Sequence, residues 1–350
     1  MSMAGTTDTK TAASHYVDVQ GLVKRFGGDR AVDDVSFSVA KGKFLTLLGP
    51  SGCGKTTTLM SIAGLHTIDA GSIRVGGAVY TAPAEGIFLP PEKRDIGMVF
   101  QSYAIWPHMT VAENVAYPLE IRKVAREEIN ARVADVLALV GLSRMSAKLA
   151  TQLSGGQQQR AALARAIVSR PRLLLFDEPL SNLDLKLREQ MRVELKRIQH
   201  EVGITSIYVT HDQAEALVMS DDIIVMSKGR IQQKGGPREI YARPVNAYVS
   251  NFIGVVNLLR GHVTAVTAAA ALCSGTEALY SHYKNGFHYA AQYTPLVVAP
   301  ALAATAVAAL PQRRARRTRG LLAGLSLAAM LDGAVGTAYH ARGVLRRPGG

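Results

Sequence analysis

The sequence predicts an α/β fold built around a parallel sheet, and three patterns along its 350 residues point to this class. Strand-like runs alternate with helical runs between 171 and 232, as in parallel strands joined by crossover helices. The apolar run 43–48 leads directly into a glycine-rich loop and the start of a helix. A second apolar run, 173–176, ends in the acid pair Asp177 and Glu178. Open parallel sheets bind ligands at the carboxyl ends of their strands, so a site is expected where both runs end.

The glycine-rich loop fits the phosphate-binding pattern G-x-x-x-x-G-K-[ST]. Its residues, with the threonine that follows them, are Gly49, Pro50, Ser51, Gly52, Cys53, Gly54, Lys55, Thr56 and Thr57. Glycines let backbone N–H groups turn toward phosphate oxygens, and the start of a helix adds positive potential there. Lys55 is expected to reach the β- and γ-phosphates, and Thr56 to place its hydroxyl on Mg²⁺. The loop therefore predicts a binding site for ATP and Mg²⁺.

The acid pair after the second apolar run supports the same chemistry. Asp177 fits a ligand that holds Mg²⁺ through water, and Glu178 is free to polarise an attacking water molecule. Two solvated acids at a strand end are the alternative interpretation. The phosphate loop upstream favours the catalytic interpretation over this one.

A third motif, Leu153 followed by Ser154, Gly155, Gly156 and Gln157, precedes a helix expected over 157–169. Its hydroxyl and backbone donors would lie at a helix N-terminus, which makes a second anion site. In this order the motifs resemble the ATP-binding subunits of ABC transporters, and the resemblance runs over residues 16–260. It implies a P-loop NTPase core with a parallel sheet, an antiparallel β subdomain and a helical signature subdomain. It also implies that the third motif, the signature, caps the γ-phosphate bound by a second subunit.

Four further residues match this family by their place in the chain. Gln101 resembles the glutamine that contacts Mg²⁺ or the attacking water, and His211 resembles the switch histidine at the γ-phosphate. Asp184 ends a segment, 181–184, that resembles the loop linking the two sites across the dimer. Phe26 resembles the aromatic ring that stacks on adenine, although a phenylalanine ahead of a strand could also belong to the core. A lone histidine after a strand is usually a surface residue, so the position of His211 carries its assignment.

The resemblance thus implies three catalytic residues, Glu178, His211 and Gln101, and three metal ligands, Thr56, Gln101 and Asp177. It implies a homodimer of ATPase subunits that works with transmembrane permease subunits and, indirectly, with a substrate-binding protein. The expected location is the cytoplasmic face of the bacterial inner membrane.

Composition narrows the range of partners. The formal net charge of +13 could indicate a nucleic-acid partner. However, residues 311–350 hold eight arginines and one aspartate, a net of +7, so more than half of the excess charge lies in this short segment. The rest of the chain is only mildly basic, and we therefore expect no nucleic-acid partner. The two cysteines, Cys53 and Cys273, imply no disulfide framework and suit a reducing cytosol.

We divide the chain into three parts. Residues 1–14 are small and polar and are expected to form a disordered lead, not a signal peptide. Residues 15–260 are expected to be the ATPase domain. Residues 261–350 depart from the family, which usually continues into a small β-rich domain, and their alanine-rich sequence predicts helices. The uncharged stretch 290–310 is long enough to cross a bilayer, but the arginines after it would then lie on the unfavoured side. Insertion into the membrane, packing on the surface and a fusion without function stay open.

The resemblance predicts ATP hydrolysis that energises import of iron, a polyamine or a similar solute. Residues 102–111 are apolar and aromatic where the family receives a helix of the membrane subunit, and Tyr103 and Trp106 are the expected anchors, with ordinary core as the alternative. A soluble ABC-type ATPase in DNA repair or translation is the alternative function. Such proteins need a long coiled-coil insertion or two ATPase halves in one chain, and the sequence has neither.

The sequence also makes two local predictions, one for the helices of residues 112–141 and one for the Cys53 thiol. Residues 112–141 are expected to form two helices with Pro118 near the break between them. The Cys53 thiol is expected at a helix N-terminus beside Lys55, where the thiolate form is favoured.

Overall fold

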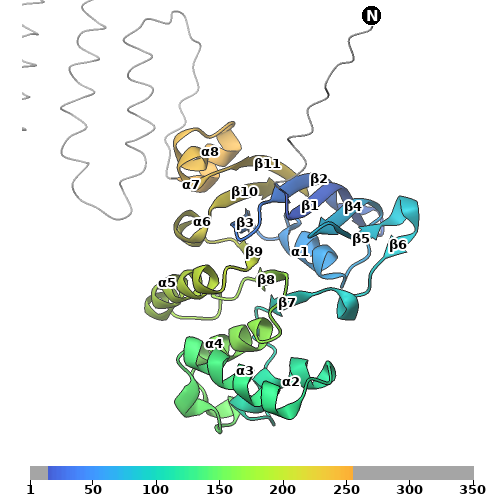
Figure 1. Cartoon of the computed structure of the whole chain (residues 1–350). Coiled ribbons are helices and arrows are strands. Elements are labelled where there is room, and N and C mark those ends of the chain that lie inside the picture. Colours follow the sequence, from blue (N-terminus) through green and yellow to red (C-terminus); the bar gives the residue numbers. More distant parts are fainter. Residues whose placement is uncertain (1–14, 255–350) are drawn as a thin grey trace, which may run out of the picture. The chain divides into compact units, whose positions relative to one another are not determined.

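The computed structural model describes residues 15–254, so our expectations for residues 1–14 and 255–350 lie outside the described part of the chain. Two sheets and a group of helices make up most of this part (Figure 1). Residues up to Val245 belong to one compact unit. The helix α8 (Ala247–Ile253) belongs to another unit, and it begins where the Asn246 side chain accepts a hydrogen bond from the Val249 N–H. The predicted α/β class is confirmed for the described residues.

The first sheet has six strands in the order β11-β10-β3-β9-β8-β7. They are β3 (Phe44–Leu48), β7 (Ile96–Val99), β8 (Leu173–Asp177), β9 (Thr205–Thr210), β10 (Asp222–Ser227) and β11 (Arg230–Gly235). All neighbouring strands are parallel except for the pair β10 and β11. Every residue of β3 and β8 is buried, which explains why both strands are continuous apolar runs. Because β9 lies between them, the ends of β3 and β8 frame one site.

The second sheet is antiparallel, with the order β2-β1-β4-β5-β6, and it confirms the predicted antiparallel subdomain. Its strands are β1 (Val17–Phe26), β2 (Asp29–Val39), β4 (Ala70–Val75), β5 (Ala78–Ala82) and β6 (Ile87–Phe88). Inward residues of this sheet, such as Val19 and Ile73, share one apolar core with Leu45 and Leu175 of the parallel sheet. This packing is possible because β1 and β2 each turn an apolar face inward.

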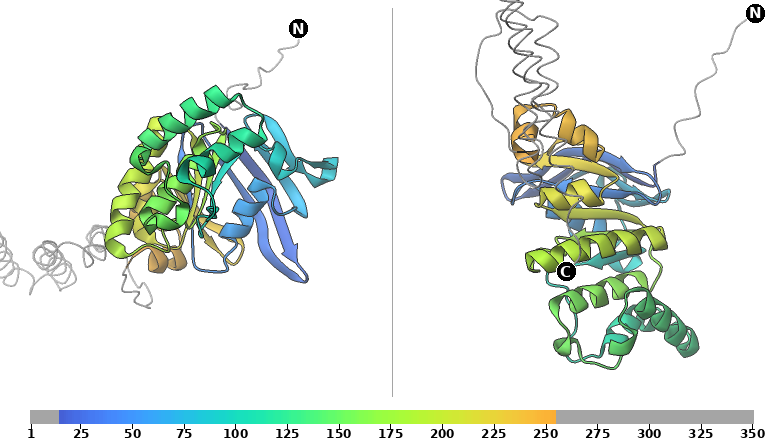
Figure 2. Two further views of the ribbon diagram at one scale, coloured as in Figure 1. Left: turned by 90° about the horizontal axis from the view of Figure 1, so that it is seen from below. Right: turned by 90° about the vertical axis from the view of Figure 1, so that its left-hand side faces the viewer.

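Three helices, α2 (Val111–Ile121), α3 (Arg126–Leu139) and α4 (Gly155–Ile167), gather at one end of the larger unit (Figures 1 and 2). They form the predicted helical subdomain, and their apolar faces continue into a second core together with Phe44, Phe176 and Tyr208. This continuity links the helix that begins at the signature to the parallel sheet.

The two helices expected over 112–141 are α2 and α3, and the break between them, at 122–125, lies near Pro118 as expected. Pro118 lies inside α2, and the chain leaves that helix after Ile121. Thr110 and Glu113 form a reciprocal capping box at the N-terminus, and Leu119 is buried beyond the proline. These contacts hold the helix on both sides of Pro118, and so outweigh the lost backbone hydrogen bond.

Most of the remaining helices of the larger unit pack against strands of the parallel sheet. These remaining helices are α1 (Lys55–Ala63), α5 (Leu185–Val202), α6 (Gln213–Met219) and α7 (Pro237–Ala242), with short 3₁₀ turns at η1 (Pro83–Glu85), η2 (Pro91–Lys93), η3 (Ser143–Met145) and η4 (Ala150–Gln152). The helix α5 is the longest of them, with 18 residues. Within residues 15–254, no helix is both long and apolar enough to span a bilayer.

Candidate nucleotide site

The glycine-rich loop joins the end of β3 to the start of α1, and its conformation requires glycine. Gly52 and Gly54 have φ angles of 77° and 99°, in the left-handed region that disfavours other residues. A Cβ atom on Gly49 would lie 2.5 Å from the Met226 carbonyl oxygen. A Cβ atom on Gly54 would lie equally close, 2.5 Å, to the Ala31 carbonyl oxygen. Backbone therefore packs against the loop from outside, which leaves its inner side to a ligand.

The Lys55 ammonium group lies inside this loop. Its Nζ donates to the carbonyl oxygens of Gly49, at 2.8 Å, and Pro50, at 2.9 Å. The side chain is buried, and Nζ also lies 3.8 Å from the Cys53 Sγ. The loop thus concentrates a positive charge and several backbone groups at the N-terminus of α1, an arrangement that favours an anion.

Thr56, in the first turn of α1, lies next to Asp177, the last residue of β8. The Thr56 hydroxyl donates to Asp177 Oδ1 at 2.9 Å. Burial raises the pKa of the Asp177 carboxyl, the Thr56 hydrogen bond lowers it, and the adjacent charge of Glu178 raises it further. Two hard oxygen ligands predicted for Mg²⁺ therefore lie side by side, in surroundings where a cation would stabilise the carboxylate.

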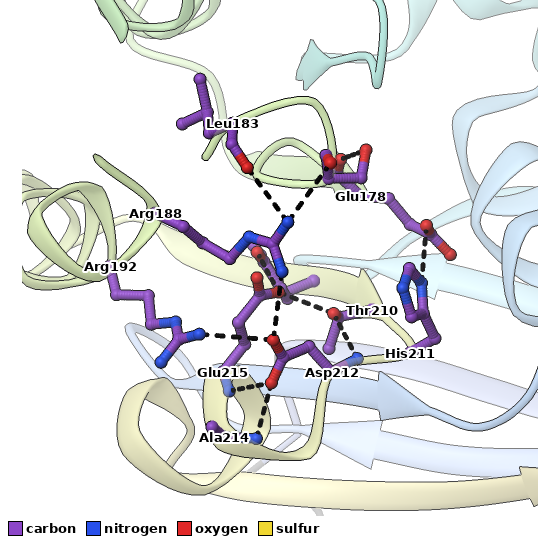
Figure 3. Close-up of polar contacts among 11 residues, drawn as sticks. Glu178, Leu183, Arg188, Arg192, Thr210, His211, Asp212, Ala214 and Glu215 are labelled. Carbon is purple, nitrogen blue, oxygen red and sulfur yellow. Dashed lines mark hydrogen bonds and ion pairs between the residues drawn. The ribbon is translucent and has the colours of Figure 1, made fainter. Parts of the chain in front are cut away.

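Glu178 and His211 meet at the ends of the neighbouring strands β8 and β9. Glu178 Oε2 lies 2.9 Å from His211 Nδ1 (Figure 3). The Glu178 N–H donates to the Val209 carbonyl at 3.1 Å, and the residue has a φ of 43°, which is uncommon for glutamate. Such backbone conformations persist where surrounding contacts enforce them, often at functional sites. The two predicted catalytic side chains thus form one pair.

The backbone of Gln101 contacts a loop of the same site. Its carbonyl accepts a hydrogen bond of 2.9 Å from the Asn182 side chain, which joins the loop after β7 to the loop before α5. The Asp184 side chain accepts from the Leu187 N–H at 2.9 Å and so caps α5. The roles expected for Gln101 at a metal ion and Asp184 across a dimer stay predictions.

The signature residues begin α4, two residues earlier than expected. Ser154 is the N-cap, and its N–H donates to the Gln157 side chain at 2.9 Å. Ser154 and Gly155 are exposed, whereas Gly156 is buried. The first two signature residues are therefore exposed at the start of α4, and their role as a cap on a second subunit's nucleotide stays a prediction.

Phe26 does not belong to the core. Its side chain is 49% exposed at the end of β1, with its ring edge-on to His66 at a centroid distance of 5.5 Å. The Lys24 ammonium lies 5.2 Å from the Phe26 ring centroid. An exposed ring at the end of a strand is available for stacking on a base, and this role of Phe26 stays a prediction.

The expectation for Tyr103 as an exposed anchor is wrong. Tyr103 is 7% exposed and belongs to the core of the helical subdomain, because the left-handed backbone at Tyr103 and Ala104 turns its ring inward. Trp106 is half-buried, with its ring 4.4 Å from the Tyr117 ring and 4.6 Å from the Arg165 guanidinium. Arg165 also donates to the Tyr103 carbonyl at 2.9 Å, so these residues hold the loop onto α4.

The expectation of a favoured Cys53 thiolate is also wrong. Cys53 is 3% exposed, and burial raises the pKa of its thiol, an effect larger than the opposing one of Lys55. In a Cys273→Ser background we expect iodoacetamide to modify Cys53 at least about tenfold more slowly in the native chain than in urea. Bound ATP should slow the reaction further, and alkylated protein should no longer hydrolyse ATP. Equal rates in the native and unfolded chain, measured by mass spectrometry, would contradict the buried position.

Four polar residues near the catalytic pair received no role from the sequence: Glu215, Asp212, Arg188 and Arg192. Glu215, in α6, accepts hydrogen bonds from the hydroxyls of Tyr208 and Thr210 at 2.9 and 2.6 Å, and burial raises its pKa. Asp212 forms ion pairs with Arg188 and Arg192 of α5. The sequence carried one signal for Asp212, since it directly follows His211, whereas no motif marked Arg188 and Arg192.

A phosphate loop between a buried strand and a helix, with an acid pair at the end of a nearby parallel strand, defines a P-loop nucleotide-binding protein. The family model described as "ABC transporter" matches residues 32–181. MalK of Thermococcus litoralis, named as a trehalose/maltose import ATP-binding protein, is 55% identical over 231 residues, 66% of this chain and 62% of that protein. PotA of Rubrobacter xylanophilus, named as a spermidine/putrescine import ATP-binding protein, is 50% identical over 273 residues, 77% of this chain and 71% of that protein.

Solved structures agree with these relatives. CbiO1 of Clostridium perfringens, part of the ABC transporter complex cbiONQ, matches with a TM-score of 0.60 and 28% identity, over 66% of this chain and 92% of that one. The ATP-binding cassette MJ0796, a dimer in a post-hydrolysis state with ADP and Pi, matches with a TM-score of 0.54 and 31% identity, over 63% and 99%. The chain belongs to the ATP-binding proteins of ABC transporters. The match spans less than two thirds of the length of MalK.

Proposed function

We propose that this chain hydrolyses ATP as the ATPase subunit of an ABC importer. The observation that carries the proposal is the contact of 2.9 Å between Glu178 and His211 at the end of the parallel sheet. The phosphate loop lies at the end of β3, and β9 lies directly between β3 and β8. An anion site and a carboxylate–imidazole pair thus share one edge of the sheet, an arrangement that suits hydrolysis of the phosphoanhydride bond to the γ-phosphate of ATP.

In this proposal each residue has one task. The amides of the glycine loop and the Lys55 ammonium bind the phosphates, in place of the carbonyl contacts that Lys55 makes here. Glu178 polarises a water molecule for in-line attack on the γ-phosphate, and His211 orients Glu178 and contacts the γ-phosphate. Phe26 stacks on the adenine.

The residues present fit a magnesium ion. Thr56 Oγ1 and Asp177 Oδ1, 2.9 Å apart, are hard oxygen donors, and Gln101 would add a third. Bound with ATP, Mg²⁺ would neutralise charge on the phosphate oxygens.

The signature suggests that the site is completed by a second copy of the chain. Ser154, Gly155, Gly156 and Gln157 would contact the γ-phosphate of the partner subunit, with Asp184 near the contact between the two sites. Hydrolysis would then remove the group that both subunits hold, so the dimer would open. We propose residues 15–260 as the ATPase domain; the part of it beyond 254 and the extension 261–350 lie outside the described residues.

We propose a cytoplasmic location on the inner membrane, with transmembrane permease subunits and a substrate-binding protein as partners. Relatives named for import of trehalose/maltose and of spermidine/putrescine support a small solute such as a sugar or a polyamine. The same names favour transport over a soluble role in DNA repair or translation.

Phosphate release and solute uptake test this proposal. The full chain should release phosphate from ATP only with Mg²⁺, and Lys55→Ala should lose most ATP binding, because the ammonium at the phosphates is gone. Co-expressed with a permease and a binding protein encoded beside it, the full chain should support uptake of their solute, while the Lys55→Ala chain should not. ATP hydrolysis without any association with the permease would point to a non-transport role instead.

A further inference from the structure

Arg188 reaches from helix α5 to two loops of the site at once (Figure 3). One terminal nitrogen, Nη2, donates to the Leu183 carbonyl at 3.1 Å and to the Ser181 carbonyl at 3.4 Å. The other, Nη1, forms an ion pair with Asp212 Oδ2 at 3.6 Å. Arg188 therefore connects the segment after Glu178 to the segment that begins with His211.

Asp212 is a firm attachment point on the His211 side. Its Oδ1 accepts hydrogen bonds from the N–H groups of Ala214, at 2.8 Å, and Glu215, at 3.2 Å. Its own N–H donates to the Thr210 hydroxyl at 3.0 Å. These contacts hold the backbone on both sides of His211. A displacement of Asp212 would therefore also displace the His211 imidazole.

On the Glu178 side, Arg188 donates hydrogen bonds to the turn that starts at Glu178. The Ser181 N–H and hydroxyl both bond to the Glu178 carbonyl, at 3.2 and 2.9 Å, and the Ser181 carbonyl is one of the two that Arg188 holds. The left-handed backbone of Glu178 begins this turn. By holding the turn, Arg188 therefore helps to fix the backbone conformation that orients the Glu178 carboxylate.

Helix stability does not explain this arginine. Arg188 lies in the first turn of α5, four residues after the N-cap Asp184, where the positive end of the helix dipole disfavours a cation. Arg192, one turn further along, offers a comparison within the same helix. It donates to Asp212 at 3.3 Å but has no contact with the 181–183 carbonyls among the described residues.

We propose that Arg188 is a positioning residue that couples the 178–184 loop to the 210–212 loop and so maintains the Glu178–His211 contact during ATP hydrolysis. The kinetic consequence rests on the proposed ATPase function, whereas the coupling itself is a property of the nucleotide-free chain. Arg188 touches no reacting atom in this proposal; it acts through the two loops.

Hydrogen–deuterium exchange on the full-length, nucleotide-free chain tests the coupling directly. Arg188→Met keeps the apolar stem but removes every donor, so peptides covering both 179–184 and 210–216 should exchange at least about threefold faster. Arg192→Met is the matched control, and it should accelerate exchange in 210–216 alone. Acceleration of neither loop, or of the same single loop in both variants, would overturn the proposal.

Steady-state kinetics of the same proteins test the consequence. Arg188→Met should lower kcat about tenfold with less than about twofold change in the KM for ATP, because the binding groups stay in place while the pair is misaligned. Arg188→Lys keeps the charge and should recover part of kcat, and Arg192→Met should lose less than Arg188→Met. Equal losses in kcat for Arg188→Met and Arg192→Met would show that only the charge on Asp212 matters.

The outcomes separate the two proposals. If the unmodified chain does not hydrolyse ATP, the proposed function fails, and the exchange data still decide whether Arg188 couples the loops. If the unmodified chain hydrolyses ATP and Arg188→Met matches its kcat, the positioning role fails alone. Should Arg188→Met not fold, Asp212→Asn in combination with Arg188→Lys replaces it: a double variant no slower than the slower single variant supports coupling through this contact, and additive losses contradict it.

Discussion

Replacing Glu178 with glutamine is expected to lower the rate of ATP hydrolysis by about 10²- to 10⁴-fold, because an amide cannot take up a proton from the attacking water. The glutamine has the same size and can still bond to His211 Nδ1, so the 2.9 Å contact and the fold should survive. ATP binding should remain close to normal, since the phosphate loop is unchanged. Uncleaved ATP should then hold two subunits together, and size-exclusion chromatography should show a dimer only with ATP and Mg²⁺.

Glu189→Gln is the matched control for this substitution. Glu189 is an exposed glutamate in α5, so the same change of charge there should leave turnover within about twofold of the unmodified chain. Near-normal phosphate release by Glu178→Gln would remove Glu178 from the catalytic role. Loss of ATP binding together with turnover would instead show that the substitution had disturbed the phosphate loop.

The Arg94→Met variant is expected to lose about 3 kcal/mol in the free energy of unfolding, because the buried guanidinium satisfies several acceptors that would remain buried. Arg94 is 3% exposed and donates to the carbonyls of Ser61, Ile62 and Leu89 at 3.0, 2.6 and 2.7 Å. It also donates to the Thr81 hydroxyl at 2.7 Å, and burial lowers its pKa to about 10. The side chain therefore ties the end of α1, which follows the phosphate loop, to the antiparallel sheet.

Urea unfolding monitored by circular dichroism measures this loss. Arg74→Met is the control, since Arg74 is exposed on β4 of the same sheet and its replacement should change the free energy of unfolding by less than about 0.5 kcal/mol. Arg94→Lys should be nearly as unstable as Arg94→Met, because one ammonium group cannot reach acceptors on α1, on β5 and at Leu89 together. A change below about 1 kcal/mol for Arg94→Met would show that water replaces the guanidinium contacts.

Sequence reasoning succeeded where a local motif and its neighbours carry the information. The strand–loop–helix around Lys55 and the buried run ending in Asp177 were predicted because fully buried parallel strands are recognisable as apolar runs. It was wrong about Tyr103, since packing in the helical subdomain outweighed the local signal. It was also wrong about Cys53, where burial exceeds the effect of a nearby lysine on the pKa.

The sequence by itself determined the family, the order of the motifs and the residue types available at each strand end. Only the tertiary structure decided which of them touch. The strand order places β9 between β3 and β8, so residues separated by more than thirty positions, Glu178 and His211, meet at 2.9 Å. Arg188 became visible as a link between two loops for the same reason. Its contacts depend on where α5 packs, and packing is set by burial across the whole core and not by any short pattern in the chain.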